Sequence, residues 1–462
     1  MASVRLIDRE QEMAQLREAA AQAAAGTSQL VVVWGRRRVG KTFLLSHFAR
    51  DARAVFFGAT QQAQGVELGR LADAVRRDLG DSAADLAGGD FTSWEAALRF
   101  FAALAAEQPL TVVLDEVPYL VASTPGFASI VQAVWDHLPS GTRLTLVLTG
   151  SAIAMMETMI GAGGALRGRP TLTLKLAALD PVQARAFLPD MEPAAFLEAY
   201  AACGGYPLHL RAWDQRASTD ANLLRLAATP GGILLEDAAG MLAEELTHAG
   251  GYARVLAAIG RGRTRYAEIA AESDQRVERP LEVLMRAGFI AKTLPVGAPR
   301  GARASYRIAD PYLAFWFGVL YTDIPQIEAG QGRAVLRRRA PAWRGHLGAV
   351  FEDAARTHAR RLVLRGELPQ DMVIDRWWAA SGEPCEIDVL GLCGARTVLL
   401  GEARWQARPL GARDLAQLQR KAARAPRAVE LPIFALWGRG GVENRIRSAG
   451  VLGFDPSDVL AG

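Results

Sequence analysis

Gly35, Gly40, Lys41 and Thr42 fit the spacing of a phosphate-binding loop within the stretch LVVVWGRRRVGKTFLLSHFA. Glycines at these positions let backbone amides curl around phosphates, the lysine reaches the β and γ oxygens, and the threonine hydroxyl binds magnesium. The stretch has the pattern of an apolar strand, a loop and an amphipathic helix, which is the context that this chemistry needs. The residues expected to contact ATP here are Gly35, Arg36, Arg37, Arg38, Val39, Gly40, Lys41, Thr42 and Phe43.

Two further strands are expected to end beside this loop. The strand Leu110 to Leu114 is followed by Asp115 and Glu116. Asp115 would join Thr42 in holding Mg²⁺, and Glu116 would orient or deprotonate the attacking water. The apolar stretch RLTLVL leads to Ser151, which is placed to sense a γ-phosphate. The sequence therefore predicts an ATPase that uses ATP and Mg²⁺.

Six motifs carry a resemblance to a known family. In order they are LIDREQEMAQL, GRRRVGKT, LDEVPYL, LTGSAIAMME, LRGRPTLTLKL and GGYPLHL, and they span about residues 1–235. This order resembles the prokaryotic AAA+ ATPases of the STAND branch, in particular the family often called archaeal ATPases. The resemblance implies an α/β P-loop core with a helical lid. It also implies that Arg9 lies near the adenine, that Arg169 reaches the nucleotide, and that Pro207 reports on it from the lid.

Lys41, Glu116 and Arg169 are thus the expected catalytic residues. Arg169 has an alternative interpretation as a surface arginine.

The middle of the chain has the pattern of a winged helix. Residues 252–307 suggest three short helices followed by two strands around the glycine-rich turn GAPRGAR. In such a domain the third helix can enter a major groove. The arginines expected to neutralise DNA phosphates are Arg276, Arg279 and Arg286 on or near that helix, and Arg300 and Arg303 on the wing. The alternative is that this domain serves only as a spacer or a protein contact.

The tail carries acidic residues in the order of a PD-(D/E)XK nuclease. Glu352 lies on a predicted helix, Asp388 on a strand, and Glu402 on the next strand with Arg404 two positions on. The three carboxylates would gather around a magnesium ion, with the base by the scissile phosphate. The tail also resembles a domain of unknown function that ends many of these ATPases, with segments FE, WW, EIDV and a glutamate-base-tryptophan run.

Arg404 departs from this pattern, which expects a lysine. Arginine cannot be deprotonated and holds a phosphate as a rigid fork. Only four of the 53 basic residues are lysines, namely Lys41, Lys175, Lys292 and Lys421, so arginine at this position agrees with the general composition. Lys41 nevertheless persists where phosphate chemistry requires it. We therefore expect nucleic-acid binding by the tail, with little or no cleavage.

Composition sets the remaining expectations. Half of the residues are hydrophobic and 22% are charged, which is typical of globular proteins. No apolar run of spanning length, signal peptide or zinc-like cysteine cluster is found in the sequence, so we expect a cytoplasmic protein without membrane contact. Basic residues concentrate in 252–307 and 331–462, which favours DNA as a partner. A protein partner or a homo-oligomer is a further expectation.

The expected organisation is an ATPase core (1–175), a helical lid (176–245), a winged helix with an aromatic helix (246–322), a linker (323–341) and a nuclease-like domain (342–462). The leading hypothesis is an ATPase whose nucleotide state controls DNA engagement by the winged helix and the tail. The two alternatives are an ATP-gated, Mg²⁺-dependent endonuclease and a signalling scaffold that binds only protein.

Overall fold

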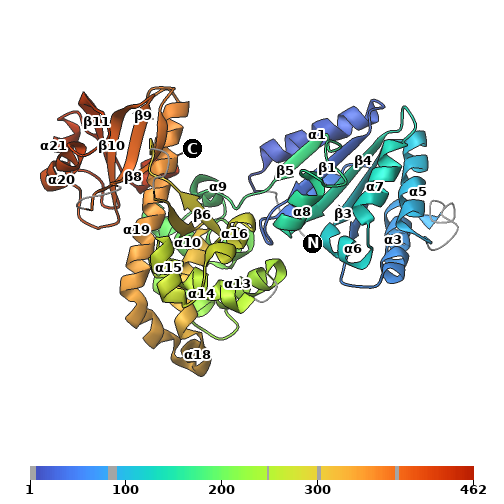
Figure 1. The fold of residues 1–462 in the computed structure, drawn as a ribbon, viewed down its shortest axis with the longest axis horizontal. Helices are drawn as coiled ribbons and strands as arrows, with labels where there is room; N and C mark the ends of the chain where they lie inside the picture. Colours follow the sequence, from blue (N-terminus) through green and yellow to red (C-terminus); the bar gives the residue numbers. More distant parts are fainter. Residues whose placement is uncertain (1–6, 82–90, 247–248, 299–302, 380–383, 462) are drawn as a thin grey trace. The chain divides into compact units, whose positions relative to one another are not determined.

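The structure is a computed structural model that describes residues 7–81, 91–246, 249–298, 303–379 and 384–461. The chain forms two compact units, Met1–Ala178 and Leu179–Gly462, whose elements are labelled in Figure 1. Among the described residues, no single helix is long and apolar enough to cross a membrane. The bent pair Val117–Ser123 and Phe127–Asp136 meets that test only when its halves are combined.

The first unit is built on a parallel five-stranded sheet. Its strands are β1 (Gln29–Trp34), β2 (Ala54–Gly58), β3 (Leu110–Asp115), β4 (Leu144–Gly150) and β5 (Leu172–Lys175), in the order β2-β3-β4-β1-β5. The strands β1, β3 and β4 are buried along their whole length. Continuous apolar runs of this kind are expected where helices cover both faces of a parallel sheet. The expected α/β core is confirmed.

Seven helices surround this sheet in the described part of the unit. They are α1 (Glu10–Ala24), α2 (Lys41–Ala49), α3 (Gln64–Leu79), α5 (Trp94–Glu107), α6 (Val117–Ser123), α7 (Phe127–Asp136) and α8 (Ile153–Ile160). Because the strands are parallel, the carboxyl ends of β1, β3 and β4 lie along one edge, with Trp34 paired to Gly150. Ligands of open α/β sheets bind at this edge, and the loops that follow these strands carry the predicted site.

The second unit begins with helices. These are α9 (Pro181–Arg185), α10 (Pro193–Cys203), α11 (Pro207–Ala212), α12 (Thr219–Ala227) and α13 (Ile233–Glu245). Next come three helices and an antiparallel hairpin, namely α14 (Ala249–Gly260), α15 (Tyr266–Ser273), α16 (Glu278–Arg286), β6 (Ile290–Thr293) and β7 (Ser305–Ile308). Leu281 and Leu284 anchor α16, while charged residues cover its other side.

The aromatic segment forms buried helical turns, as its apolar density suggests. It comprises α17 (Pro311–Phe315), a π-helical turn (Trp316–Leu320) and a 3₁₀ turn (Tyr321–Asp323), with Tyr312, Phe315 and Phe317 inaccessible to solvent. The structure differs from the expected linker over 323–341. The short turns Ile324–Gln326 and Ile327–Gln331 lead into the 33-residue helix α19 (Gly332–Leu364), which runs through Pro341. Its Ala, Leu and Arg content favours helix and outweighs the proline.

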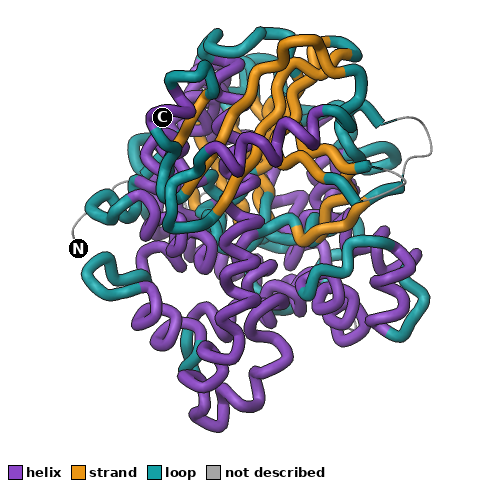
Figure 2. The backbone as a smooth tube through the Cα atoms, turned by 90° about the vertical axis from the view of Figure 1, so that its left-hand side faces the viewer, coloured by secondary structure: helices purple, strands orange, loops and turns teal. Residues whose placement is uncertain are grey.

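A second five-stranded sheet completes the unit. Its strands, in the order β12-β11-β10-β9-β8, are β8 (Val373–Trp378), β9 (Glu386–Cys393), β10 (Arg396–Arg404), β11 (Ala428–Gly438) and β12 (Leu452–Phe454). The pairs β8–β9 and β9–β10 are antiparallel, and β10–β11 and β11–β12 are parallel. Figure 2 views this unit from the end that carries the sheet, where strands lie above a body composed mostly of helices.

Helices cover both faces of this sheet. Leu436 packs in one core with Leu418 of α20 (Ala412–Ala422), whereas the indole of Trp437 donates to His358 of α19 at 3.1 Å. Since neighbouring side chains of a strand point to opposite faces, α19 and α20 lie on opposite sides. The short helices α21 (Asn444–Arg447) and α22 (Pro456–Leu460) end the chain.

Candidate active site and carboxylate cleft

The loop between β1 and α2 has the shape of a phosphate cradle. A Cβ on Gly35 would lie 2.2 Å from the carbonyl oxygen of Leu176, so only glycine fits there. Gly40 has a φ of 98° and lies directly before α2, in a conformation that favours glycine. The predicted residues Arg36, Arg37, Arg38 and Val39 form the turn between these glycines, and Phe43 lies in the first turn of α2. The amides at the start of this helix suit an anion.

Lys41 is buried inside the loop. It is 4% exposed, and its Nζ donates to the carbonyl oxygens of Gly35 at 2.8 Å and Arg36 at 3.0 Å. These carbonyls belong to the loop that would surround the β and γ phosphates. The ammonium is therefore held where phosphate charge needs a cation.

Thr42 and Asp115 meet across the sheet edge. The hydroxyl of Thr42 donates to Oδ2 of Asp115 at 2.6 Å. Burial raises the pKa of Asp115, and the nearby charge of Glu116 adds to this rise. A hydroxyl and a carboxylate are the hard oxygen ligands that Mg²⁺ prefers, so the residues fit the ion. Bound there, Mg²⁺ would supply positive charge to the β and γ oxygens of ATP.

Glu116 is fixed beside the phosphate loop in a left-handed conformation, with a φ of 56°. Its Oε2 accepts hydrogen bonds from the Ser151 hydroxyl at 2.8 Å and the Ser151 amide at 3.2 Å. The sequence predicts that Ser151 senses the γ-phosphate, and in this structure its hydroxyl contacts Glu116. The arrangement orients one carboxylate oxygen and leaves the other to position water.

Arg9 connects the start of the chain to the phosphate loop. It is 8% exposed, and its Nη2 donates to the carbonyl oxygens of Ala177 at 2.6 Å and Val39 at 3.3 Å. Its Nη1 pairs with Glu12 at 2.8 Å. Arg9 thus joins the phosphate loop, at Val39, to the segment that follows β5, at Ala177.

The family resemblance implies two further nucleotide residues, Arg169 and Pro207. Arg169 holds Asp136 in a two-pronged pair, with Nε and Nη2 at 2.8 and 2.7 Å from the carboxylate oxygens. Pro207 begins α11 in the second unit.

The loop, the Asp115–Glu116 pair and the parallel sheet define the first unit as a P-loop ATPase domain. Residues 6–212 match a family model described as an ATPase domain predominantly from Archaea. Residues 316–423 match another, described as archaeal and bacterial proteins of unknown function. Both matches agree with the resemblances seen in the sequence, and the chain therefore has ATPase activity.

Individual relatives are distant. An uncharacterized protein of Methanocaldococcus jannaschii is 26% identical over 439 residues, which cover 92% of each chain. A Walker-type ATPase of Pyrococcus abyssi is 19% identical with a TM-score of 0.49, over 68% of this chain and 96% of that chain. The ORC2 protein of Aeropyrum pernix in ADPNP–ADP complexes is 16% identical with a TM-score of 0.45, over 70% and 95%. The ATPase assignment rests on the family model and the site.

The three tail carboxylates gather in a second place, which we call the carboxylate cleft: Glu352, Asp388 and Glu402. Asp388 and Glu402 are 6% and 3% exposed, and Oδ2 of Asp388 accepts from the Ala403 amide at 3.0 Å. Burial, and then the charge of Asp388, raises the pKa of Glu352 to about 8. The same two causes raise the pKa of Glu402. The carboxylates are therefore close enough to repel one another.

The carboxylate cleft also contains a basic residue, Lys421, that the sequence interpretation did not include. Nζ of Lys421, on α20, lies 2.8 and 2.6 Å from the two carboxylate oxygens of Glu402. Arg404 also contacts Glu402 from its own strand, as the two-residue spacing predicts. The scarcity of lysine was the signal that could have identified Lys421. In this arrangement the described residues show no group of three or more acidic, histidine or cysteine side chains poised to hold a metal.

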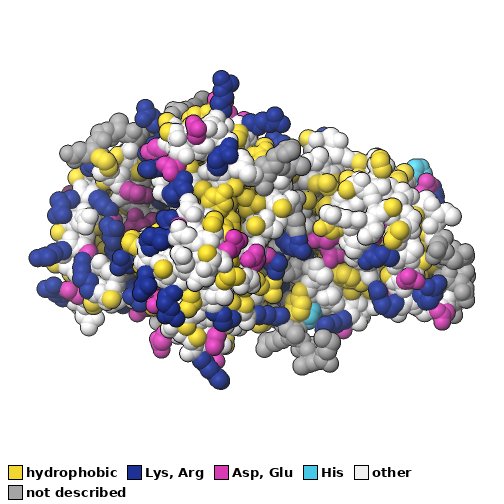
Figure 3. Space-filling model, turned by 90° about the horizontal axis from the view of Figure 1, so that it is seen from below, with side chains coloured by type: hydrophobic (Ala, Val, Ile, Leu, Met, Phe, Trp, Pro, Cys, Tyr) yellow, Lys and Arg dark blue, Asp and Glu magenta, His cyan; other side chains and the backbone are white. Residues whose placement is uncertain are grey.

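The DNA-binding candidates are on the surface. Arg276 precedes α16, Arg279 and Arg286 lie on it, Arg303 precedes β7, and all four are exposed. Arg300 lies outside the described residues. In Figure 3, Lys and Arg side chains are numerous over the second unit, at left, with acidic side chains between them.

Replacing Glu352 by glutamine should stabilise the protein at pH 8 but not at pH 5. In the folded state the pKa is raised from its ordinary 4.5 to about 8, so the folded chain binds more protons between these values. Stability must then fall as pH rises through that window. The variant escapes this loss, and we expect a gain of about 1–3 kcal/mol at pH 8.

Urea unfolding at both pH values would measure this gain. Glu367→Gln, an exposed glutamate just after α19, is the matched control and should show no such gain. Equal pH dependence in the parent and Glu352→Gln would contradict the raised pKa.

Proposed function

We propose that the ATPase domain controls binding of DNA by the second unit. In this proposal the chain is an AAA+ protein of the STAND branch that acts in the cytoplasm. The helices α14–α16 with the hairpin β6–β7 act as a winged helix, and residues 342–462 as a PD-(D/E)XK nuclease-like domain.

The observation that carries the proposal is the composition of the carboxylate cleft. Glu352, Asp388 and Glu402 come from a helix and two adjacent strands, and two basic side chains, Arg404 and Lys421, converge on Glu402. Carboxylates with raised pKa values favour a cation, and the two bases suit a phosphate. Basic side chains beside carboxylates are typical of sites where a protein contacts the phosphodiester of a nucleic acid.

The exposed arginines at the winged helix support the same conclusion. Three exposed arginines lie on or beside α16, namely Arg276, Arg279 and Arg286. Among the described residues, none of them forms an ion pair. Arginines that are not neutralised by neighbours are available to phosphates.

Lys421 favours a second candidate function, an ATP-gated and Mg²⁺-dependent endonuclease. The sequence has arginine where a nuclease of this class carries lysine, but Lys421 brings an amine to the same glutamate. An amine can position and polarise water, which a guanidinium does poorly. In this case supercoiled plasmid should be nicked in Mg²⁺, and Asp388→Ala should abolish the nicking.

The proposal predicts DNA binding that falls steeply with salt. Removing one phosphate contact should reduce the slope of log affinity against log salt by about 0.9. Replacing Arg276, Arg279 and Arg303 together by glutamine should therefore lower the slope by about 2.7. Fluorescence anisotropy of a labelled duplex would measure this slope between roughly 50 and 200 mM salt, a range in which phosphate contacts weaken strongly.

Arg17→Gln, Arg50→Gln and Arg99→Gln, three changes in the first unit, form the matched control and should leave the slope unchanged. A slope that the first triple variant does not alter would remove these arginines from the interface. No binding at low salt with or without ATP would favour the protein scaffold.

A further inference from the structure

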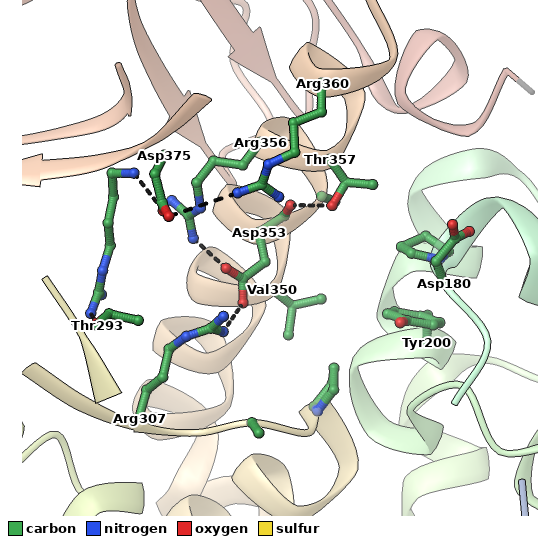
Figure 4. A pocket seen from close by; sticks show the side chains of 15 residues that line it. Asp180, Tyr200, Thr293, Arg307, Val350, Asp353, Arg356, Thr357, Arg360 and Asp375 are labelled. Carbon is green, nitrogen blue, oxygen red and sulfur yellow. Dashed lines mark hydrogen bonds and ion pairs between the residues drawn. The ribbon is translucent and has the colours of Figure 1, made fainter. Parts of the chain in front are cut away.

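A polar cavity of ≈ 250 Å³ lies where the hairpin β6–β7, helix α19 and strand β8 meet, within the second unit. None of its lining residues belongs to the phosphate loop or the carboxylate cleft. Figure 4 shows Arg307, Asp353, Arg356 and Arg360 turned toward one space, with Asp180 and Tyr200 on the facing wall. A second cavity, of ≈ 570 Å³, shares Arg307, Asp353, Arg356 and Arg376 with it. We call the smaller cavity the arginine pocket.

The aspartates of the arginine pocket are largely occupied. Oδ2 of Asp353 accepts from Arg307 Nη1 at 2.8 Å, and Oδ1 pairs with Arg356. Oδ2 of Asp180 accepts from Arg361, which does not line the pocket, at 2.7 Å. Neither Asp353 nor Asp180 forms an ion pair with Arg376, a further arginine that lines the pocket.

Arg376 therefore lacks a carboxylate partner. Its Nη2 donates to the hydroxyls of Thr293 at 2.7 Å and Ser305 at 3.1 Å, and its Nε is buried without a hydrogen-bond partner. No ion pair of Arg376 is found in the described part of the chain. The only other aspartate lining the pocket, Asp375, lies 4.0 Å from Arg360.

The electrostatics of Arg376 indicate an excess of positive charge. Burial lowers the pKa of this guanidinium, and the charges of Arg356 and Arg307 lower it further, against a smaller opposite effect of Glu386 and Asp353. Arginine does not lose its proton in proteins, and the guanidinium lies 4.9 Å from the centroid of the Trp378 ring, which offsets part of this cost. A bound anion would offset the rest.

We propose that the arginine pocket binds a phosphate group, either free or at the end of a larger molecule. Several guanidiniums that approach from three elements can each hold an edge of a tetrahedral oxyanion, which a planar carboxylate could not satisfy. The hydroxyl of Thr357, on α19, also lines the pocket. The volume is sufficient for a phosphate, and the residues shared with the second cavity leave space for a larger molecule that carries one.

The pocket is joined to the carboxylate cleft through one residue. Nη1 of Arg356 donates to the backbone carbonyl of Asp388 at 2.7 Å, while its other arm holds Asp353. A phosphate that binds Arg356 would therefore affect the hydrogen bond between Arg356 and β9, the strand that carries Asp388. The inference itself does not require that the chain bind DNA.

Calorimetric titration with inorganic phosphate tests the pocket. The full chain carrying Lys41→Ala is used, so that the phosphate loop loses its main cation. We expect one site, and Arg376→Gln in that background should weaken it at least tenfold. Arg337→Gln, an exposed arginine on α19, is the matched control and should leave the affinity unchanged.

Two further arms complete the test. Arg360→Gln, a half-exposed change, should weaken binding about threefold even if Arg376→Gln does not fold. A 5′-phosphorylated dinucleotide is compared with inorganic phosphate and with the unphosphorylated dinucleotide. If it binds tenfold tighter than both, the natural ligand is the phosphorylated end of a nucleic acid. If it binds with the same affinity as inorganic phosphate, the natural ligand is free phosphate. Absence of phosphate binding, or equal binding by the parent and both pocket variants, would overturn the proposal.

Discussion

Glu116→Gln is expected to leave ATP binding unchanged and to slow ATP hydrolysis by at least about 100-fold, the usual contribution of a positioned general base. The carboxylate is held by two hydrogen bonds from Ser151, at 2.8 and 3.2 Å, beside the Thr42–Asp115 pair. An amide can keep this position but cannot accept the proton of the attacking water. Nucleotide affinity from a fluorescent ATP analogue and phosphate release at saturating ATP would separate the two effects.

Lys41→Ala should instead abolish ATP binding, because it removes the cation that is buried inside the loop. Glu107→Gln, an exposed change at the end of α5, is the control and should retain the parent rate. Hydrolysis by Glu116→Gln at the parent rate would show that another group activates the water.

Lys421→Met is expected to destabilise the second unit by about 3 kcal/mol, because loss of the lysine leaves the buried charge of Glu402 with the partly exposed Arg404 as its counter-ion. Glu402 is 3% exposed, and both of its oxygens accept from Nζ of Lys421. Burial and the charge of Asp388 already raise the pKa of Glu402, and the lysine opposes them. The loss should therefore be larger at pH 8 than at pH 5.

Denaturant unfolding of the parent and three variants would measure this interaction. The double variant Glu402→Gln with Lys421→Met removes both charges and should recover most of the loss. Arg420→Met, at the exposed neighbouring position of α20, should cost little. Equal stability of Lys421→Met and the parent would mean that Arg404 alone balances Glu402.

The nucleotide site could be predicted because its parts are short in sequence. A strand, a loop and a helix within Gln29–Ala49 carry the phosphate loop, and Asp115 and Glu116 follow a strand that is apolar throughout. Parallel strands then bring these ends to one edge. The hydrogen bond from Ser151 to Glu116 could not be predicted, because it depends on a side-chain rotamer and not on a spacing.

The carboxylate cleft was predictable only in part. Arg404 follows Glu402 by two residues on one strand, so their contact follows from the alternation of side chains. Lys421 reaches the same glutamate from a helix 19 positions later, where only packing of α20 against the sheet sets the distance. The residues that line the arginine pocket are spread from 180 to 376 in the sequence, and no local sequence pattern predicts that they come together.

The uninterrupted helix α19 was missed for a different reason. Pro341 and the glycines before it predicted a break between two domains. In the structure Gly330 has a φ of 79°, and the helix begins two residues later. The break therefore precedes α19, and the packing of the helix overrides the preference of one proline.

The most direct test of the central claim is DNA affinity in defined nucleotide states. Anisotropy of a labelled duplex at low salt would be measured for Glu116→Gln with ATP and Mg²⁺, with ADP, and without nucleotide, and again for Lys41→Ala. We predict that ATP and ADP give affinities at least about fivefold apart in Glu116→Gln, the lower range of allosteric coupling, and that Lys41→Ala does not respond. Equal affinity in all nucleotide states, or no binding in any of them, would contradict the claim.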